Sequence, residues 1–383
     1  MAVSGFRLRT ERRFAPGLRP WESRPSSQWR KQMGVDGDLL KKYTLTTWGF
    51  KQGETVSLMI NLGVRLGIYT ALDGAGSVTA SDLAAATGLH ERWLREWLRA
   101  QAAAGLLVSD DGEVFLLEDE AAMVLARVDT PTYAGGVFSH IRHPRVADGL
   151  EEAFRTGLGL TYDGQGEGSE HHVEAMLAPM ARALLVPTVI PALAGVVDHL
   201  EAGAKVVDIG CGTGLALQLM AEAWPRSSYE GYDVSERAVA VARERFADVD
   251  NVTIHLAGAE DVPPTADADL VMTMDCLHDM PRPDLAMAAI RGAVASGGTW
   301  LVKEIRSSPE WSLNQRNPML AMMYSTSVAS CMSSAMSTPD GLGLGTLGLD
   351  PVTLEAMVAE AGFTRFTMHD LDDPTNLYYE IRP

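Results

Sequence analysis

The sequence predicts an α/β protein: a doubly wound, mostly parallel sheet forms the second half of the chain and follows a mostly helical domain. Three observations carry this prediction. From Lys205 onward, continuous apolar stretches alternate with amphipathic ones, the pattern of buried parallel strands separated by helices. The first of these strands runs into a glycine-rich turn. Upstream, residues 39–126 have helical periodicity and end in a short hairpin pattern.

The composition is that of a globular protein. Of 383 residues, 46% are hydrophobic and 21% are charged, which supplies ample core material. The formal net charge of −18 argues against non-specific binding to nucleic acid or to an anionic membrane, because both carry the same sign. No uninterrupted run of about 18 apolar residues occurs, so no membrane span is predicted. The three cysteines have no paired spacing, which fits a reducing cytoplasm and predicts no metal site.

The first 126 residues divide into two parts. Residues 1–38 contain many arginines and few acids and predict a disordered extension. Residues 39–126 carry a short helix, a glycine break, a second helix over Glu91–Ala103 and a hairpin pattern around Asp111. Helix, turn, helix and wing in that order predict a winged-helix domain.

A winged helix raises the question of DNA binding. The helix expected over Glu91–Ala103 carries two glutamates among three arginines, so its charges nearly cancel in a chain that is acidic overall. We therefore expect no nucleic-acid partner. The domain is predicted instead to pair two subunits into a homodimer.

The rest of the chain divides into a linker and a catalytic part. Residues 127–200 predict helices with glycine-rich interruptions that form a linker and a lid over the substrate. His171, His172 and Glu174 lie close together there, but nothing downstream has matching ligand spacing, so we expect a solvated helix start and no metal. Residues 201–383 form the sheet domain, with a Met-rich lid insertion at about 309–348.

The glycine-rich turn follows the first strand of the sheet. "VVDIGCGTG" places Asp208 before Gly210, Gly212 and Gly214, where nucleotide-like ligands lie against backbone and a side chain would hold them away. Asp233 ends the second strand, where a carboxylate accepts the ribose hydroxyls of a nucleoside. The acid before the glycines would repel a pyrophosphate but attracts a cation. The predicted ligand is adenosine-like and cationic, a description that S-adenosylmethionine meets.

The two segments "VVDIGCGTG" and "YEGYDVSE" resemble motifs of the class I S-adenosylmethionine-dependent methyltransferases, which have a Rossmann-like sheet. The resemblance implies that Ala259 and Glu260 contact adenine, although Gly258 stands where many members have Asp. It also implies a place for Asp275 in the donor site. A winged-helix domain before such a sheet is similar to O-methyltransferases that dimerise through it. "DCLHDM", residues 275–280, resembles a group of actinobacterial small-molecule methyltransferases.

His278 follows the fourth strand, beside the first, and is expected to face the donor. A hydroxyl acceptor needs its proton removed, and an imidazole that titrates near neutrality suits this task. In O-methyltransferases with a similar "HDW" motif this His is the general base, and Glu304 in "LVKEI" matches the carboxylate that orients it. The second carboxylate of that family is missing, and Gly348 lies about there. Asp279 is expected to be a turn residue.

These patterns predict a cytoplasmic methyltransferase of specialised metabolism that moves a methyl group from S-adenosylmethionine to a small, partly apolar acceptor. O-methylation with His278 as the base is the expected reaction. One alternative is N- or C-methylation, in which His278 only positions the acceptor. A second alternative is a winged-helix regulator that senses S-adenosylmethionine and binds DNA.

Overall fold

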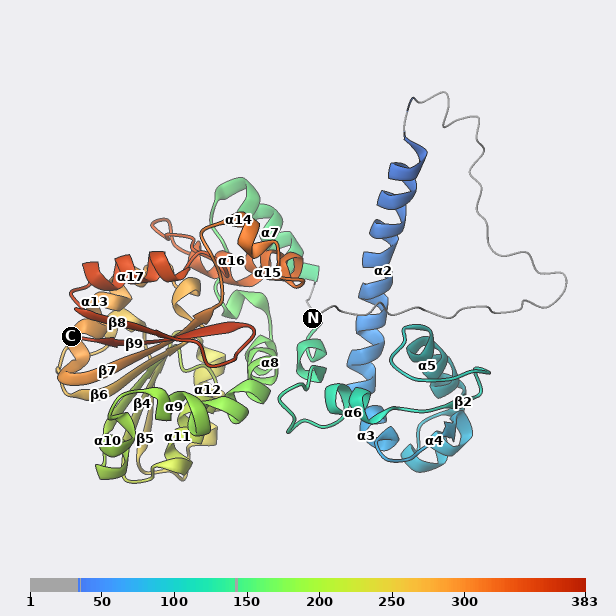
Figure 1. Cartoon of the computed structure of the whole chain (residues 1–383), viewed down its shortest axis with the longest axis horizontal. Coiled ribbons are helices and arrows are strands. Elements are labelled where there is room, and N and C mark those ends of the chain that lie inside the picture. Colours follow the sequence, from blue (N-terminus) through green and yellow to red (C-terminus); the bar gives the residue numbers. More distant parts are fainter. Residues whose placement is uncertain (1–33, 35, 142–143) are drawn as a thin grey trace, which may run out of the picture. The chain divides into compact units, whose positions relative to one another are not determined.

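The computed structural model describes residues 34, 36–141 and 144–383 (Figure 1). The chain forms two compact units, residues 1–55 and 56–383. The predicted disordered extension lies almost wholly outside the described residues. Where its last residues are described, they already enter helix α2, Gly37–Arg65.

Residues 68–125 form a small, mostly helical domain. Its elements are α3 Ile68–Leu72, β1 Val78–Thr79, α4 Ala80–Thr87, α5 Glu91–Ala103, β2 Val114–Phe115 and α6 Asp119–Leu125. Thr79 begins α4 with a capping box, because its hydroxyl accepts the Asp82 N–H while the Asp82 carboxylate accepts the Thr79 N–H. Helix α5 has the bounds that the sequence predicts. Tyr69, Trp97 and Leu98 are buried in the core of this domain.

The wing differs from the predicted two-stranded hairpin. Strand β2 pairs with β1 instead, and the hairpin contributes only the single bridge between Val108 and Leu116. The reason lies in the turn. The Asp111 carboxylate accepts the N–H groups of Glu113 and Val114, so these donors are used locally and are not free for a longer ladder.

Within the described residues, seven strands form the central sheet of the second half (Figure 1). They are β3 Lys205–Ile209, β4 Ser228–Asp233, β5 Val252–Leu256, β6 Ala268–Met274, β7 Val294–Ile305, β8 Arg365–His369 and β9 Asn376–Arg382. Their order is β5-β4-β3-β6-β7-β9-β8. Strands β3 to β7 run parallel and β9 runs antiparallel to both neighbours. The predicted doubly wound sheet with an antiparallel edge pair is confirmed.

Helices cover both faces of this sheet, as Figure 1 shows. One face packs against α10 Val196–Ala202, α11 Leu215–Ala223 and α12 Glu236–Arg245, and the other against α13 Pro283–Ala293 and α17 Pro351–Glu360. Successive residues of β3 pack on opposite faces of the sheet. Val206 belongs to the apolar core under α10, α11 and α12, and Val207 to the core under α13 and α17. A strand buried on both sides must be apolar throughout, which explains the continuous apolar runs of the sequence.

The two segments predicted as lids contact each other. The first holds α7 Pro144–Thr156 and α8 Ser169–Leu184, and the second holds α14 Trp311–Asn314, α15 Leu320–Thr326 and α16 Met332–Ala335. The N–H of Leu160 donates to the Ser333 hydroxyl at 2.8 Å. At Gly159 a Cβ would lie 2.0 Å from the Ser333 carbonyl oxygen. Only glycine permits this approach of the two backbones.

One helical stretch, Ser169–Ala192, is long and apolar enough by length and composition to cross a membrane, with a mean hydropathy of 1.5. It begins with α8 and continues through a π-helical turn to Ala192. Glu174 within it forms an ion pair with Arg245 of α12, and Leu185 is buried in the core of the sheet domain. These contacts are those of a helix that packs on the sheet domain.

Candidate active site

A cavity of about 610 Å³ opens at the carboxyl ends of β3, β4 and β6, the usual ligand position in a doubly wound sheet. Its wall combines the glycine turn, the ends of these strands and both lid segments. The predicted donor residues that line it are Asp208, Gly210, Gly212, Asp233, Ala259, Glu260 and Asp275. The structure thus brings together seven residues from four separate segments of the sequence.

Asp208 is a buried carboxylate at the floor of this cavity. It is 1% exposed, and its Oδ1 has no hydrogen-bond partner among the described residues. Burial raises the pKa of Asp208 to about 8, and the negative charge of Asp233 adds to the shift. A buried carboxyl group without a partner suits a cationic ligand, which would supply both the missing contact and the missing charge. This donor set fits the ammonium group of S-adenosylmethionine.

The three glycines of the turn have different tasks. Gly210 and Gly212 line the cavity, and Gly214 does not. A Cβ on Gly214 would lie 2.6 Å from the Phe246 ring, so this glycine lets the start of α11 approach the end of α12. Its neighbours Thr213 and Leu215 line the cavity, and the contact of Gly214 itself with the donor stays a prediction.

Asp233 ties the glycine turn to the end of β4. Its Oδ2 accepts the Gly212 N–H and its Oδ1 accepts the Ser235 N–H, both at 2.8 Å. Burial raises the pKa of Asp233, while these backbone hydrogen bonds oppose the shift. Each oxygen keeps a second lone pair, so the carboxylate can still accept ribose hydroxyls.

Asp275 occupies the cavity wall in a left-handed backbone conformation, with φ of 58°. Its carboxylate pairs with Lys303 and accepts a hydrogen bond from the Asn376 side chain. Sequence reasoning missed Lys303, although it is a charged residue inside the apolar strand "TWLVKEI". It is 6% exposed and also lines the cavity. A charge in a buried strand needs a charged partner. The lysine in this apolar segment could therefore have indicated a buried ion pair from the sequence alone.

His278 and Glu304 are in contact, as the sequence predicts, but neither lines the cavity. Nδ1 of His278 lies 2.5 Å from Oε2 of Glu304, and Oε1 of Glu304 accepts the Leu277 N–H at 3.1 Å. The other ring nitrogen, Nε2, lies 3.0 Å from Oδ1 of Asp279. His278 is 3% exposed. The expectation that its ring faces the donor is wrong, because a carboxylate contacts each nitrogen.

Asp279 takes the place at the cavity wall that the sequence assigned to His278. It lines the cavity, and its Oδ2 accepts a hydrogen bond from the hydroxyl of Tyr162 in the first lid segment. Asp279 does lie in a short 3-10 turn, Leu277–Asp279, as predicted, but the sequence did not show that its side chain reaches the cavity. Tyr162 was missed altogether, because the two residues meet only when the lid folds over the end of β6.

Charge is distributed unevenly over this cluster. Burial opposes a charge on His278, but the attraction of Glu304 and then of Asp279 outweighs it, so the pKa of His278 lies well above its ordinary value. Burial also raises the pKa of Glu304, against the attraction of His278. For Asp279 the effect of burial is overcome by the His278 charge and by side-chain hydrogen bonds with His278, Tyr162 and Cys331, and its pKa is lowered. The favoured state is an imidazolium between two carboxylates.

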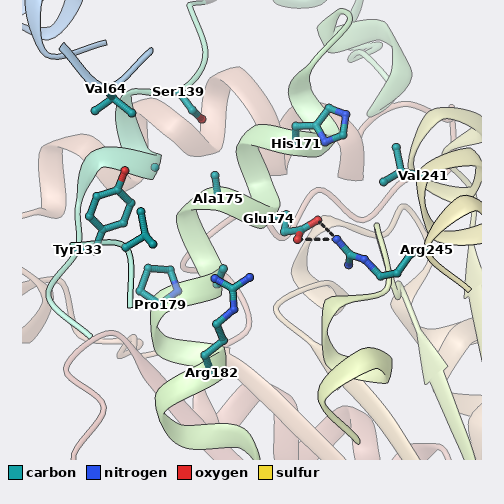
Figure 2. A pocket seen from close by; sticks show the side chains of 13 residues that line it. Val64, Tyr133, Ser139, His171, Glu174, Ala175, Pro179, Arg182, Val241 and Arg245 are labelled. Carbon is teal, nitrogen blue, oxygen red and sulfur yellow. Dashed lines mark hydrogen bonds and ion pairs between the residues drawn. The ribbon is translucent and has the colours of Figure 1, made fainter. Parts of the chain in front are cut away.

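Figure 2 shows a second cavity, of about 390 Å³, beside α8. Glu174 there forms an ion pair with Arg245 and accepts the Thr213 hydroxyl at 2.5 Å. His172, one of the three residues that the sequence singled out as a possible metal cluster, contacts Ser139 at 3.0 Å. Among the described residues, the ligand atoms that do converge within 4.8 Å belong to His278, Asp279 and Cys331.

Comparison with known families decides what this sheet is. Residues 200–362 match the family model described as a methyltransferase domain. The sheet domain is thus similar to methyltransferase domains. Residues 54–127 match the model described as an Rv2258c-like winged HTH domain, so the methyltransferase domain follows a winged helix, and that predicted fold class is confirmed. S-adenosylmethionine is the methyl donor of this class, and the residues on the cavity wall fit it.

Curated relatives resemble about a quarter of the chain. Trans-aconitate 2-methyltransferase of Mycobacterium sp. (strain KMS) is 31% identical over 105 residues, 27% of this chain and 39% of the relative. Ubiquinone biosynthesis O-methyltransferase of Aromatoleum aromaticum is 37% identical over 100 residues, 25% of this chain and 42% of the relative. The chain thus spans about two fifths of the length of these curated relatives.

Solved structures resemble the chain over most of its length. Human N-acetylserotonin methyltransferase in complex with S-adenosylmethionine covers 91% of this chain and 98% of its own, with a TM-score of 0.63 and 18% identity. The mitomycin 7-O-methyltransferase MmcR covers 91% and 99%, with a TM-score of 0.60 and 20% identity. At these identities the likeness establishes the fold. The resemblance of "DCLHDM" to one actinobacterial group stays a prediction.

Proposed function

We propose that this protein is an S-adenosylmethionine-dependent methyltransferase that methylates a hydroxyl group of a small, partly apolar acceptor. One observation carries the proposal. The same cavity holds the unpartnered carboxylate of Asp208 at one end and the carboxylate of Asp279, backed by the buried His278–Glu304 pair, at the other. A cation-binding carboxylate and an ionisable cluster in one cavity are what methyl transfer to a hydroxyl requires.

The donor end needs little more than placement. Asp208 would hold the ammonium group of S-adenosylmethionine, Asp233 the ribose, and Ala259 with Glu260 the adenine. When bound, the donor supplies a methyl group already activated at a sulfonium. The chain's task is then to align an acceptor with it and to exclude water, which is a proximity effect.

The acceptor end is shaped by both lid segments. Apolar side chains of α8 and of the turn after β6 contribute to its wall, among them Val173, Leu177 and Met280. From the Met-rich insertion the lining residues are Ser334, Ser337, Thr338 and Asp340, and its methionines are not among them. This mixed lining supports an acceptor with one apolar part and one polar end.

The charges of the wall favour a neutral acceptor. Glu170, Asp279 and Asp340 line the cavity, while the guanidinium of Arg282 pairs with Asp284 and Asp340. An acceptor carboxylate would be repelled there. This observation favours a hydroxyl acceptor over a carboxylic acid such as the one named for the trans-aconitate enzymes.

The winged-helix domain is proposed to serve a homodimer. Helix α2 exposes large apolar side chains around its circumference: Leu39, Tyr43, Leu45, Trp48 and Phe50 are 49% to 73% exposed. A helix with so much exposed apolar surface calls for a partner. On α5, Arg92, Arg95 and Arg99 each pair with a glutamate, which leaves little free positive charge for DNA.

The test combines donor binding with a search for the acceptor. Calorimetric titration with S-adenosylmethionine is followed by release of S-adenosylhomocysteine in the presence of phenols, amines or carboxylic acids. We expect donor binding and turnover with phenols. Turnover with amines alone would replace O-methylation by N-methylation. Donor binding without turnover, together with salt-dependent DNA binding, would favour the regulator. Absence of donor binding would overturn the proposal.

A further inference from the structure

We propose that Asp279 is the catalytic residue that takes the acceptor's proton, and that Tyr162 is the positioning residue that holds it. His278 and Glu304 form a charged support behind it. This inference rests on the proposed methyl transfer to a hydroxyl group. It assigns the proton to a residue other than the histidine that the sequence singled out.

The four side chains form one continuous line from the sheet to the cavity. Glu304 of β7 contacts Nδ1 of His278 at 2.5 Å, and Nε2 of the same ring contacts Oδ1 of Asp279 at 3.0 Å. The hydroxyl of Tyr162 donates to Oδ2 of Asp279. Only Asp279 and Tyr162 of these four line the cavity.

His278 cannot perform the proton transfer in this arrangement. A general base needs a free lone pair within hydrogen-bond reach of the acceptor. Each ring nitrogen of His278 already faces a carboxylate, and the ring is 3% exposed. An imidazolium between two carboxylates also has no lone pair to offer. Its positive charge instead holds Asp279 in the ionised form.

Asp279 has the access that His278 lacks. Its Oδ1 is buried and lies 3.0 Å from Nε2 of His278, so the oxygen left to meet an acceptor is Oδ2, which Tyr162 contacts. Tyr162 remains protonated, because burial and then Asp279 raise its pKa well above the ordinary value. Its hydroxyl therefore acts as a donor that orients Oδ2, and a carboxylate oxygen with one such partner can accept a second hydrogen bond.

The proposed step transfers one methyl group and one proton. The acceptor oxygen forms a bond to the methyl carbon while the bond from that carbon to sulfur breaks, and sulfur keeps the electron pair. The acceptor's proton passes to Oδ2 of Asp279. A neutral alcohol, a sulfonium and a carboxylate become an ether, a thioether and a carboxylic acid. Asp279 then returns the proton to solvent when the products leave.

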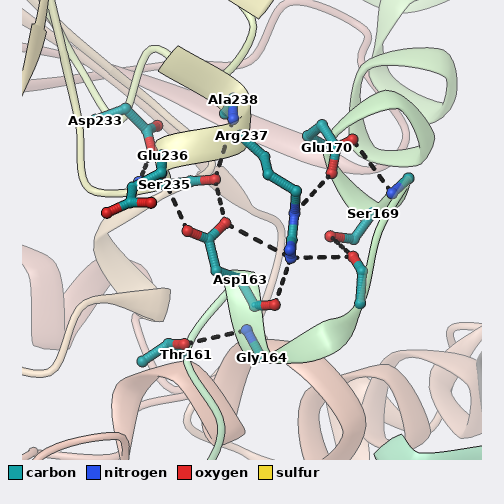
Figure 3. Close-up of polar contacts among 12 residues, drawn as sticks. Thr161, Asp163, Gly164, Ser169, Glu170, Asp233, Ser235, Glu236, Arg237 and Ala238 are labelled. Atoms are coloured by element: carbon teal, nitrogen blue, oxygen red, sulfur yellow. Dashed lines mark hydrogen bonds and ion pairs between the residues drawn. The ribbon is translucent and has the colours of Figure 1, made fainter. Parts of the chain in front are cut away.

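Tyr162 is placed by contacts that also build the donor site, as Figure 3 shows for its neighbour Asp163. The Asp163 carboxylate accepts the Ser235 hydroxyl at 2.7 Å and the Glu236 N–H at 3.0 Å, at the start of α12. The Arg237 guanidinium donates to the Asp163 and Gly166 carbonyls. The segment that carries Tyr162 is thereby fastened to the turn after Asp233, so the donor and acceptor ends are built together.

The test compares four variants on the phenol with the highest turnover in the panel above. We expect Asp279→Asn to lower kcat about 100-fold or more and to leave the dissociation constant for S-adenosylmethionine within about twofold. Asp248→Asn is the matched control, since Asp248 is exposed and lies outside the cavity wall, and it should retain wild-type kcat. If Asp279→Asn keeps more than half of the wild-type kcat while His278→Ala abolishes turnover, the proposal is overturned.

Tyr162→Phe provides a second, independent readout. The groups that titrate against Asp279 are Tyr162 from the lid, His278 beside it, Cys331 of the Met-rich insertion, and Glu304 behind the ring. The Tyr162 hydrogen bond lowers the pKa of Asp279, so its loss should move the acid limb of the kcat profile to higher pH. An unshifted limb would overturn the positioning role.

Two measurements separate this inference from its foundation. Failure of the wild-type protein to bind S-adenosylmethionine, or to methylate any hydroxyl, defeats the proposed function itself. Turnover by the wild type with an active Asp279→Asn variant defeats only the inference. Metal analysis of the purified protein completes the design, because His278, Asp279 and Cys331 are close enough to hold an ion. One retained zinc per chain would make Asp279 a ligand and overturn its role as a base.

Discussion

Asp208 lies next to the last residue of β3 and Asp233 is the last residue of the neighbouring parallel strand β4. Both line the same cavity, and the charge of Asp233 helps to raise the pKa of Asp208 to about 8. Two carboxylates in one buried cavity repel each other. A cationic ligand relieves that repulsion. The pair therefore favours a positively charged ligand even before any donor binds.

Donor binding should release a proton below pH 8. In the ligand-free protein the pKa of Asp208 is about 8. The ammonium group of the donor binds the ionised carboxylate, so the proton of Asp208 must leave when the donor binds. Between pH 5.5 and 7 the affinity should rise by up to about tenfold per pH unit. Calorimetry in two buffers of different ionisation enthalpy measures this release. An affinity independent of pH over this range would contradict it.

The same shift predicts the effect of Asp208→Asn on stability. A carboxyl whose pKa is higher in the folded than in the unfolded chain binds more protons when folded, so stability falls as pH rises. For Asp208 this loss spans the range from 3.8 to about 8. The ligand-free variant should therefore melt at a higher temperature than the wild type at pH 8, and the donor should no longer stabilise it. Thermal melts with and without S-adenosylmethionine test both statements.

Asp233→Ala should weaken binding of the donor without unfolding the domain. Loss of the ribose contacts leaves polar groups of the ligand unsatisfied, at a cost of about 1–3 kcal/mol in binding free energy. The matched control is Asp248→Asn, an exposed acid outside the cavity wall. Calorimetric titration gives both dissociation constants, and equal values would show that the ribose lies elsewhere.

Alanine at two glycines of the turn should have different effects. A Cβ at Gly214 would lie 2.6 Å from Phe246 on a backbone of positive φ, so Gly214→Ala should lower the free energy of unfolding by roughly 2–4 kcal/mol. A Cβ at Gly212 meets nothing within 4 Å but stands in the cavity wall. Gly212→Ala should cost only about 1–2 kcal/mol of stability and should weaken donor binding more strongly. Urea denaturation and titration of both variants make the comparison, and reversed effects would refute it.

The proposed homodimer depends on the apolar side chains of α2. Replacing Trp48 and Phe50, which are 68% and 73% exposed, by glutamate should convert a dimer into a monomer, because apolar contact is exchanged for charge repulsion between two copies. Light scattering after size exclusion measures the mass. Trp93→Glu, an equally exposed aromatic on α5, is the control and should leave the mass unchanged.

Local patterns were sufficient for most elements of the fold. Buried parallel strands need continuous apolar residues, and the segment Lys205–Ile209 shows this in its letters alone. Helix α5 and the capping box at Thr79 likewise depend on residues within a few positions of each other. The wing was harder, since β2 takes its partner from β1, far earlier in the chain.

The sequence by itself determined the sheet, its glycine turn and the two acids Asp208 and Asp233, because these follow from backbone geometry and from the spacing of residues along one strand and turn. It also placed His278 beside Glu304. Only the tertiary structure decided which of the cluster's groups reaches the cavity. Tyr162 and Asp279 are 117 residues apart, and they meet because the lid is anchored on α12. Access to a ligand depends on such packing, which no short stretch of sequence contains.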